Sequence, residues 1–339
     1  MEIKNILVTG SDGYIGAVLV PILIKNKFNV VGLDCGYFKK SIIGDLPLKF
    51  NQINKDIRKI SDKDLRGFDA IIHLAALSND PLGQIDPKIT EEINYKATIA
   101  LAKLAKKTGV KRFIFSSSCS IYGIARNGIV SEKSKVNPLT AYAKSKIKAE
   151  KSLQHLASKD FCVCILRNST VYGFSPKLRA DLVVNDFVTK AVLEKTITVL
   201  SDGTPWRPLI DVRDLCEIFV HFLNAETKIV NKQIYNIGFK ENNLQIKTVL
   251  EAVNRELPNC KVVYAGKYGK DVRSYKVKFS KFHKVFPQIS QKWPLGKSIN
   301  DLAKNIKNGN ISDISKYFRL NILTDLIAKK TLDKQLYWR

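Results

Sequence analysis

A tyrosine and a lysine four residues apart, Tyr142 and Lys146, are the pair in this sequence best suited to moving a proton. In a helix, side chains at positions i and i+4 lie on one face, one turn apart. A free phenol has a pKa near ~10, and a fixed positive charge beside it favours the phenolate and lowers that value. A tyrosine tuned in this way can accept a proton from an alcohol while a hydride leaves the same carbon. The spacing alone also arises by chance in lysine-rich chains, so its weight depends on three other stretches.

The first of these is a glycine-rich turn close to the N-terminus. Gly10, Gly13 and Gly16 stand between an apolar run at residues 3–8 and a helical pattern at residues 14–26. The first glycine permits a tight turn, the second lets the backbone approach a pyrophosphate, and the third lets helix and strand pack closely. A glycine turn without a ligand is the alternative, but the strand before it and the helix after it favour a dinucleotide site.

The second is a carboxylate, Asp34, at the end of the next predicted strand, residues 29–33. An acidic residue at this point of a dinucleotide-binding unit is placed for the hydroxyls of the adenosine ribose. The same charge would repel a 2′-phosphate, so the sequence favours NAD over NADP as cofactor.

The third is the run Ser116-Ser117-Ser118, which ends a predicted strand at residues 111–116. With these motifs in this order, the sequence resembles the extended short-chain dehydrogenase/reductase family, and within it the enzymes that act on nucleotide sugars. The resemblance covers roughly residues 3 to 293. It implies hydride transfer at the nicotinamide, with Tyr142 as acid/base, Lys146 bonded to the nicotinamide ribose, and Ser118 bonded to the reacting oxygen. The alternative for Ser118 is a hydroxyl that caps a loop at the strand end.

The resemblance also implies cofactor contacts along the strand ends. Asp56 and Ile57 fall where the family contacts the adenine, and the small residues after the strand at 68–74 let the chain pass beneath the cofactor. His73, in that strand, is predicted to be structural. The full set of expected cofactor residues is Gly10, Asp12, Gly13, Tyr14, Ile15, Gly16, Asp34, Asp56, Ile57, Leu74, Ala75, Ala76, Asn94, Ser116, Tyr142 and Lys146.

The second half of the chain offers ligands for the anionic part of a nucleoside-diphosphate sugar. Residues 175–187 resemble a motif of a nucleotide-sugar epimerase/dehydratase subgroup, in which Asn185 would meet the base or diphosphate. Arg207 and Arg273 fall where related epimerases place arginines that bind phosphate, and a planar guanidinium suits a diphosphate. With 56 basic residues in the chain, a surface arginine is the alternative for each. The expected substrate residues are Ser118, Thr170, Arg179, Asn185, Arg207 and Arg273.

Two departures from the family pattern bear on the reaction. Thr170 stands where many relatives have an asparagine that contacts substrate, and Ser118-Cys119-Ser120 stands where dehydratases carry Thr-Asp-Glu. A thiol and a hydroxyl do not replace the acid and base of that elimination, so we discount dehydration. Oxidation at C4 followed by re-reduction would give an epimerase. A C4 dehydrogenase or ketoreductase, a dehydrogenase of apolar alcohols, and a non-catalytic NAD- or RNA-binding relative are the alternatives.

Strands that alternate with helices predict an α/β fold, a Rossmann-type doubly wound parallel sheet. We expect an NAD-binding domain at residues 1–167 that carries Ser118, Tyr142 and Lys146. Residues 168–339 would form a smaller α/β substrate-binding region, with some segments returning to the main domain. Further strands are predicted at 49–54, 161–166, 233–237 and 260–264, and helices at 86–108, from before Tyr142 to about 157, 211–224, 245–255 and 297–308, with surface helices in the tail at 311–339.

Composition limits the class of protein. The chain has 339 residues, 45% of them hydrophobic, and a formal net charge of +25. Its lysines are spread out and little interleaved with aromatics, which argues against nucleic acid as a partner. Six scattered cysteines form no metal-type cluster, so we expect no metal site and reduced thiols. Without an apolar run of 18 residues or a basic-then-apolar leader, we expect no membrane span and a cytoplasmic location. The resemblance implies a homodimer through helices near residues 90–108 and 140–157.

Overall fold

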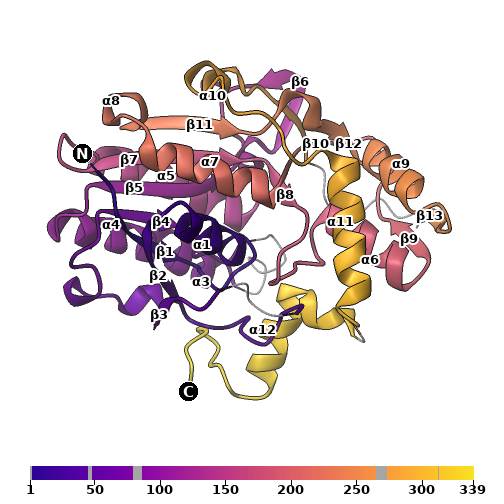
Figure 1. Cartoon of the computed structure of the whole chain (residues 1–339), viewed down its shortest axis with the longest axis horizontal. Helices are drawn as coiled ribbons and strands as arrows, with labels where there is room; N and C mark the ends of the chain where they lie inside the picture. Colours follow the sequence, from indigo (N-terminus) through magenta and orange to yellow (C-terminus); the bar gives the residue numbers. More distant parts are fainter. Residues whose placement is uncertain (1, 45–47, 79–85, 265–272, 312) are drawn as a thin grey trace.

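A seven-stranded parallel sheet forms the centre of the protein (Figure 1). The computed structural model describes residues 2–44, 48–78, 86–264, 273–311 and 313–339. The strands run in the order β11-β7-β5-β4-β1-β2-β3, every pair being parallel. This confirms the predicted Rossmann-type doubly wound fold. The strands are β1 (Asn5–Thr9), β2 (Asn29–Asp34), β3 (Asn51–Asn54), β4 (Ala70–His73), β5 (Arg112–Ser118), β7 (Cys162–Asn168) and β11 (Gln233–Ile237).

Helices cover both faces of this sheet because its strands are apolar on both sides. Strand β7, for example, is buried at every position. One face packs against α1, α7 and α10. The other packs against α5 and one long helical run in which α3 and α4 flank a π-helical segment. Their bounds are α1 (Gly16–Lys25), α3 (Pro87–Glu91), the π segment (Glu92–Ala97), α4 (Thr98–Lys107), α5 (Ala141–Leu156), α7 (Val212–Asn224) and α10 (Ser280–Val285).

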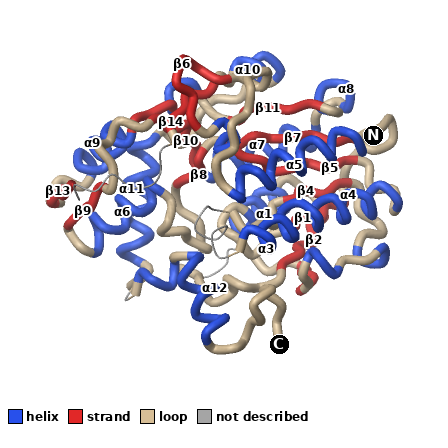
Figure 2. Tube along the Cα trace, turned by 180° about the vertical axis from the view of Figure 1, so that it is seen from behind, coloured by secondary structure: helices blue, strands red, loops and turns tan. Residues whose placement is uncertain are grey.

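A second hydrophobic core lies beside the sheet and is built by α6, α9 and α11. The two views in Figures 1 and 2 both show these helices grouped at the end of the molecule away from the N-terminus. Short strands pair outside the main sheet: β10 pairs with β8 and β12, β13 with β9, and β14 with β6. The α-helices and strands of the described residues outside the main sheet and its covering layers, together with α8 and α12, are α6 (Val183–Leu193), α8 (Thr227–Val230), α9 (Ile246–Glu256), α11 (Leu295–Asn308), α12 (Arg319–Ala328), β6 (Ile124–Val130), β8 (Thr170–Tyr172), β9 (Thr196–Val199), β10 (Trp206–Asp211), β12 (Asn243–Gln245), β13 (Lys261–Tyr264) and β14 (Ser274–Val277).

Several segments after residue 168 belong to the main sheet and its covering layers. Strand β11 extends the sheet beyond β7, and α7 packs against α1. The C-terminal tail contributes Leu323, Leu332 and Leu336 to the core on the α5 side of the sheet. The strands β6, β8, β9, β10, β12 and β14 and helix α6 were not among the predicted elements. Strands of three or four residues, such as β8, β9, β12 and β14, carry too little periodic signal to be predicted.

The carboxyl ends of β1, β2, β4, β5 and β7 meet at one edge of the sheet. The pairing register puts His73 between Thr9 and Phe115, and Ser118 beside Asn168. Ligands of open α/β sheets bind at this edge. His73 is buried there between threonine hydroxyls, with Nδ1 2.7 Å from Thr9 Oγ1 and Nε2 2.8 Å from Thr98 Oγ1. It is therefore a structural residue, as expected.

Helix α5 is held to the sheet by buried charges. Thr140 caps its start by accepting a hydrogen bond from Ala143 N at 3.2 Å. At the middle of the helix, the Glu150 carboxylate pairs with Arg167 of β7 at 2.7 Å and accepts a hydrogen bond from Ser117 Oγ at 2.5 Å. Glu150 and Arg167 are 2% and 5% exposed, so water does little to screen the pair. This bond sets how α5 lies against β5 and β7.

Replacing the Glu150 carboxylate is expected to destabilise the fold. The substitution Glu150→Gln keeps the side-chain shape but leaves the Arg167 cation buried without its anion, which costs about 3–5 kcal/mol. Urea unfolding followed by circular dichroism should show the midpoint fall with an unchanged slope. Glu91→Gln is the matched control, because it removes an exposed pair to Lys148 of the same helix. Equal stability of the two variants would contradict the role given to the buried pair.

Candidate active site

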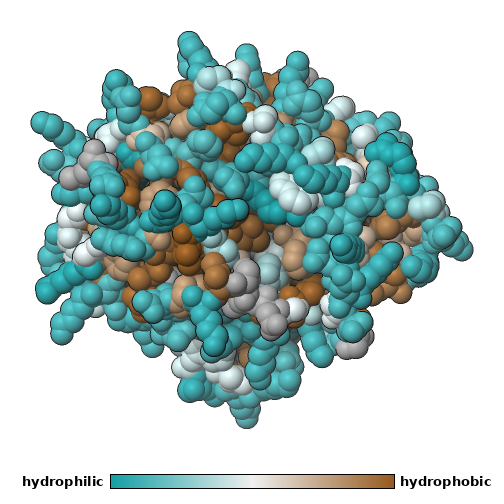
Figure 3. Space-filling view, viewed as in Figure 1, coloured by the Kyte–Doolittle hydropathy of each residue, from teal (hydrophilic) through white to brown (hydrophobic). Residues whose placement is uncertain are grey.

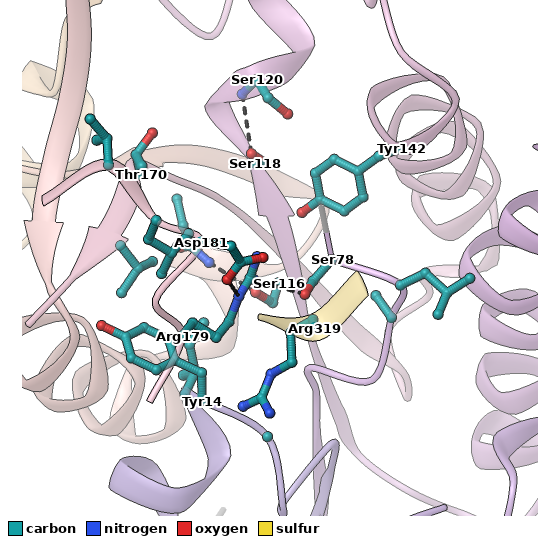
Figure 4. Close-up of a pocket in the computed structure, with 18 of the residues that line it drawn as sticks. Tyr14, Ser78, Ser116, Ser118, Ser120, Tyr142, Thr170, Arg179, Asp181 and Arg319 are labelled. Atoms are coloured by element: carbon teal, nitrogen blue, oxygen red, sulfur yellow. Dashed lines mark hydrogen bonds and ion pairs between the residues drawn. The ribbon is translucent and has the colours of Figure 1, made fainter. Parts of the chain in front are cut away.

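A cavity of about 1000 Å³ runs from the carboxyl edge of the sheet into the second region. On the face shown in Figure 3 the periphery is mostly hydrophilic, and apolar residues gather near the centre. Figure 4 shows Ser118, Tyr142, Thr170, Arg179 and Arg319 around this space on different elements, while the Tyr14 hydroxyl donates to the Gly173 carbonyl. The predicted site residues that line it are Gly10, Gly13, Tyr14, Ile15, Gly16, Asp34, Asp56, Ile57, Leu74, Ala75, Ala76, Ser116, Ser118, Tyr142, Lys146, Thr170, Arg179, Arg207 and Arg273.

The glycine loop has the geometry of a phosphate cradle. Gly10 has φ +74°, and a Cβ there would lie 2.8 Å from Ala75 N; a Cβ on Gly16 would lie 2.7 Å from Ser11 Cα. Helix α1 starts without a side-chain cap or an acidic residue in its first turn. The N–H groups of Tyr14 and Ile15 donate to no acceptor among the described residues. Open N–H groups at a helix N-terminus attract phosphate, so the residues present fit the pyrophosphate of a dinucleotide.

Asp34 sits at the end of β2, where the adenosine ribose of such a ligand would lie. Its carboxylate accepts hydrogen bonds from Asp12 N at 3.1 Å and Gly36 N at 2.8 Å. Burial, followed by the negative charge of Asp12, raises the pKa of Asp34 to about 6, although the two backbone bonds oppose this shift. The group therefore ionises just below neutral pH.

The residues predicted to transfer the proton lie where β5 meets α5. Lys146 is 3% exposed and donates from Nζ to the Ser116 carbonyl at 2.7 Å. The same Nζ lies 5.6 Å from the centre of the Tyr142 ring. Burial lowers the pKa of Lys146 to about 7, opposed by the charge of Glu150. Ser118 ends β5 and accepts a hydrogen bond from Ser120 N at 3.1 Å, so it caps the loop and also faces the cavity.

Arg179 lies between the two halves of the cavity. Its guanidinium pairs with Asp181 at 2.9 Å and donates to Ser78 Oγ at 2.9 Å. Arg207 and Arg273 lie farther into the second region, where Arg207 donates to the Arg273 carbonyl. The fold thus brings together two arginines that stand 66 positions apart in the sequence.

Three predicted binding residues do not line the cavity, and their side chains bond to protein atoms. Asp12 pairs with Lys177 at 2.9 Å. Asn94 makes two hydrogen bonds to the Leu77 backbone: its Oδ1 accepts from the Leu77 N–H, and its Nδ2 donates to the Leu77 carbonyl. Asn185 is fully buried and bonds to the Gly173 N–H, Tyr14 hydroxyl and Arg179 carbonyl. In this structure the three side chains hold the glycine loop, the Leu77 loop and Arg179 in place, and contact of these residues with a ligand stays a prediction.

Several cavity residues had not been predicted. Asn168 donates to Ser116 Oγ at 2.9 Å, while its buried Oδ1 has no partner in the described part of the chain. Ser78, Asp181 and Arg319 also line the cavity. Asn168 directly follows the Leu-Arg at the end of β7, so a search of every strand end for polar residues would have found it. Nothing in the sequence marks Arg319, a single basic residue in a lysine-rich tail.

Cys119 does not supply an acid or base to the cavity. Its thiol is 1% exposed and donates to the Arg167 carbonyl at 3.1 Å. Burial raises the pKa of the Cys119 thiol far above its usual range. Ser120, the other residue at the dehydratase positions, faces the cavity with a buried hydroxyl that has no hydrogen-bond partner among described residues.

A Rossmann sheet with an open phosphate loop, a ribose-directed carboxylate and a Ser/Tyr/Lys set defines a nicotinamide-dependent oxidoreductase class. Residues 6–238 match the model of the NAD dependent epimerase/dehydratase family, and the chain belongs to that family. It is an enzyme of the nucleotide-sugar type within the extended short-chain dehydrogenases, and NAD is its cofactor.

Named relatives include both epimerases and a dehydratase. The chain is 30% identical to a UDP-glucose 4-epimerase of Mycolicibacterium smegmatis, covering 68% of this chain and 76% of the relative. It is 28% identical to a UDP-glucuronate 4-epimerase of Thermodesulfobacterium geofontis, covering 89% and 97%. The solved structure of a Bacillus cereus UDP-glucuronic acid 4-epimerase with UDP-glucuronic acid and NAD matches with a TM-score of 0.78 and 25% sequence identity. The match covers 90% of this chain and 99% of that chain. An NAD-dependent NDP-hexosamine 5,6-dehydratase has a TM-score of 0.82 at 20% identity over 91% and 100%, which shows the shared fold.

Two further findings concern the described residues. None of their helices combines the length and apolar character that a membrane crossing requires. They contain no group of three or more His, Cys, Asp or Glu side chains arranged to hold a metal ion.

The charge on Asp34 should control cofactor affinity and choice. Ribose hydroxyls donate to the carboxylate, so NAD affinity should be constant above its pKa of about 6 and fall as the pH drops below it, by about tenfold at one unit below. Asp34→Asn should flatten this profile and bind NADP more tightly relative to NAD. Isothermal titration at several pH values measures both. Asp202→Asn, which alters an exposed carboxylate, is the control; a variant profile identical to wild type would contradict the assignment.

Proposed function

We propose that the enzyme is a nucleotide-sugar 4-epimerase: it oxidises C4 of a nucleoside-diphosphate sugar and returns the hydride to the opposite face. The carrying observation is that Ser118, Tyr142 and Lys146 share one cavity with the phosphate loop, while the positions of the dehydratase acid and base hold a buried thiol and a hydroxyl. The cavity therefore holds the residues needed for hydride transfer, but it lacks the acid and base needed to eliminate water.

Each residue has a distinct task in this reaction. Bound NAD supplies the carbon that takes up and returns the hydride. Tyr142 removes the proton of the sugar 4-hydroxyl as the hydride leaves, and it gives the proton back on re-reduction. Protonated Lys146 stabilises the phenolate, and Ser118 donates a hydrogen bond to the reacting oxygen. Between the two transfers the keto sugar must turn within the cavity.

The substrate end of the cavity suits a nucleoside diphosphate. Arg207 and Arg273 lie together there, and guanidinium groups bind diphosphates with two parallel hydrogen bonds. Because several relatives act on UDP-sugars, we take a UDP-sugar as the first substrate to test. We keep the expected homodimer and cytoplasmic location as predictions.

Net dehydrogenation is the second candidate function. It differs only in that the hydride is not returned, so the same residues serve both reactions. The balance depends on whether the keto sugar stays bound long enough to be reduced again.

Incubation with NAD and a panel of UDP-, GDP-, CDP- and dTDP-sugars tests the proposal. We expect one sugar to give a product isomer without accumulation of NADH. In deuterated water the isomer should carry no deuterium on carbon, because the hydrogen of C4 leaves and returns as hydride and no C–H bond at C3 or C5 is broken. Mass spectrometry of the product and absorbance at the NADH band provide the readout. A keto sugar formed with equal NADH would overturn epimerisation in favour of dehydrogenation, and incorporation of deuterium would show enolisation.

Substitution of the phenol separates chemistry from binding. Tyr142→Phe should lower turnover by about 10²–10⁴-fold, the usual worth of an acid/base group, while NAD still binds. Tyr95→Phe is the matched control, since the Tyr95 hydroxyl contacts Ser152 at 3.2 Å outside the cavity. Normal turnover of the Tyr142 variant would sink the mechanism.

A further inference from the structure

Arg319, the first residue of α12, enters the cofactor end of the cavity from the C-terminal tail. In Figure 4 it projects into the pocket from the yellow C-terminal ribbon. The chain just before it is anchored on both sides: Ala180 N donates to the Tyr317 carbonyl at 3.0 Å, and the Tyr317 hydroxyl donates to the Ile42 carbonyl at 3.1 Å. Arg319 is only 2% exposed.

The guanidinium is held in place but not fully used. Nη2 donates to the Lys177 carbonyl at 2.8 Å, and the group lies over the Phe38 ring at 4.2 Å. Nη1 is buried and has no hydrogen-bond partner in the described part of the chain. Buried arginine N–H groups are rarely left without an acceptor, because their desolvation is costly.

The charges around Arg319 leave room for an anion. Asp12 is engaged by Lys177 and Asp181 by Arg179, each at 2.9 Å. No ion pair joins Arg319 to a carboxylate among the described residues. Burial and the neighbouring Arg179 cation lower the pKa of Arg319 to about 9. A buried cation that faces another cation gains most from a bound anion.

The position of Arg319 indicates which anion would bind to it. Its nearby carboxylates include Asp12 of the glycine loop and Asp34 of β2, and it stacks on Phe38 just after that strand. The open N–H groups at the start of α1 border the same end of the cavity. Arg207 and Arg273 come from β10 and the residue before β14 instead. We propose that Arg319 binds the diphosphate of NAD, so that the helix N-terminus and a guanidinium from the C-terminal tail hold it together.

Contacts of the rest of the tail explain how the Arg319 side chain is held in position. Beyond α12 the chain returns to the β2–β3 edge of the sheet (Figures 1 and 2). There the Tyr37 hydroxyl donates to the Leu336 carbonyl, and Trp338 Nε1 donates to the Cys35 carbonyl at 2.6 Å. Arg58 stacks on Tyr337 at 3.6 Å. The tail is therefore fastened beside the adenosine end of the site.

Titrations of Arg319→Met with NAD, ADP and adenosine test the proposal. Loss of a charge-assisted hydrogen bond should raise the Kd for NAD and for ADP about 10- to 100-fold. Adenosine, which lacks phosphate, should bind the variant and the wild type equally. Isothermal titration suits NAD and ADP, and ligand-detected NMR suits the weaker adenosine. Unchanged ADP affinity, or an equal loss for adenosine, would overturn the assignment.

Stability separates binding from a merely structural role. Arg319→Met removes a buried charge that no carboxylate of the described residues pairs with, so the loss of the bond to Lys177 should be offset and the cofactor-free protein should stay about as resistant to urea as wild type. A structural arginine would instead cost stability. If the Met variant does not fold, Arg319→Lys keeps the charge but loses the planar fork, and the Kd for ADP should rise about threefold or more; wild-type affinity would refute the proposal. Arg255→Met, at an exposed arginine of α9, controls for net charge. Because ADP binding needs no sugar turnover, the result is independent of the proposed epimerase reaction.

Discussion

The attachment of helix α5 to the sheet is the constraint on which the active site depends. Tyr142, Lys146 and Glu150 are spaced four residues apart on that helix, so they share one face. Glu150 binds Arg167 of β7, and Lys146 binds the Ser116 carbonyl of β5. One helix is thereby tied to two neighbouring strands, and the phenol at its first turn is set relative to Ser118 at the end of β5. A shift of α5 by a fraction of a turn would move the tyrosine and break the ion pair together, so the pair opposes such a shift.

Burial gives the charges of this site their strength. Lys146 loses hydration and its pKa falls to about 7, whereas the pKa of Asp34 rises to about 6. Both groups therefore respond to pH near neutrality, and both face positions where a bound dinucleotide would restore favourable contacts. Arg179 and Arg319 add positive charge to the same enclosed space. Cationic side chains in an enclosed space favour binding of polyanionic nucleotides over neutral ligands.

Residues from both ends of the chain form the cavity. The N-terminal half contributes the phosphate loop and the proton-transfer residues, and the second region adds Arg207 and Arg273 through short strands. The tail then crosses back to the first unit and fastens to Cys35, Tyr37 and Arg58. The segment that matches the family model ends at residue 238, so the tail lies outside the match.

The sequence by itself determined the fold class and the reactive core. The patterns that predicted them are local: a strand followed by a glycine turn and a helix, Asp34 at a strand end, and Tyr-x-x-x-Lys. Each predicted residue of the glycine triplet and of the Ser/Tyr/Lys set lines the cavity. Tertiary structure decided what local pattern cannot encode. Asn185 bonds to Tyr14, 171 residues away, and is thereby withdrawn from the cavity. Arg319 contacts Lys177, 142 residues away, and is thereby brought into it. Such contacts depend on how distant segments pack in three dimensions, so residue type and short-range spacing do not reveal which polar side chains are used up and which remain open to a ligand.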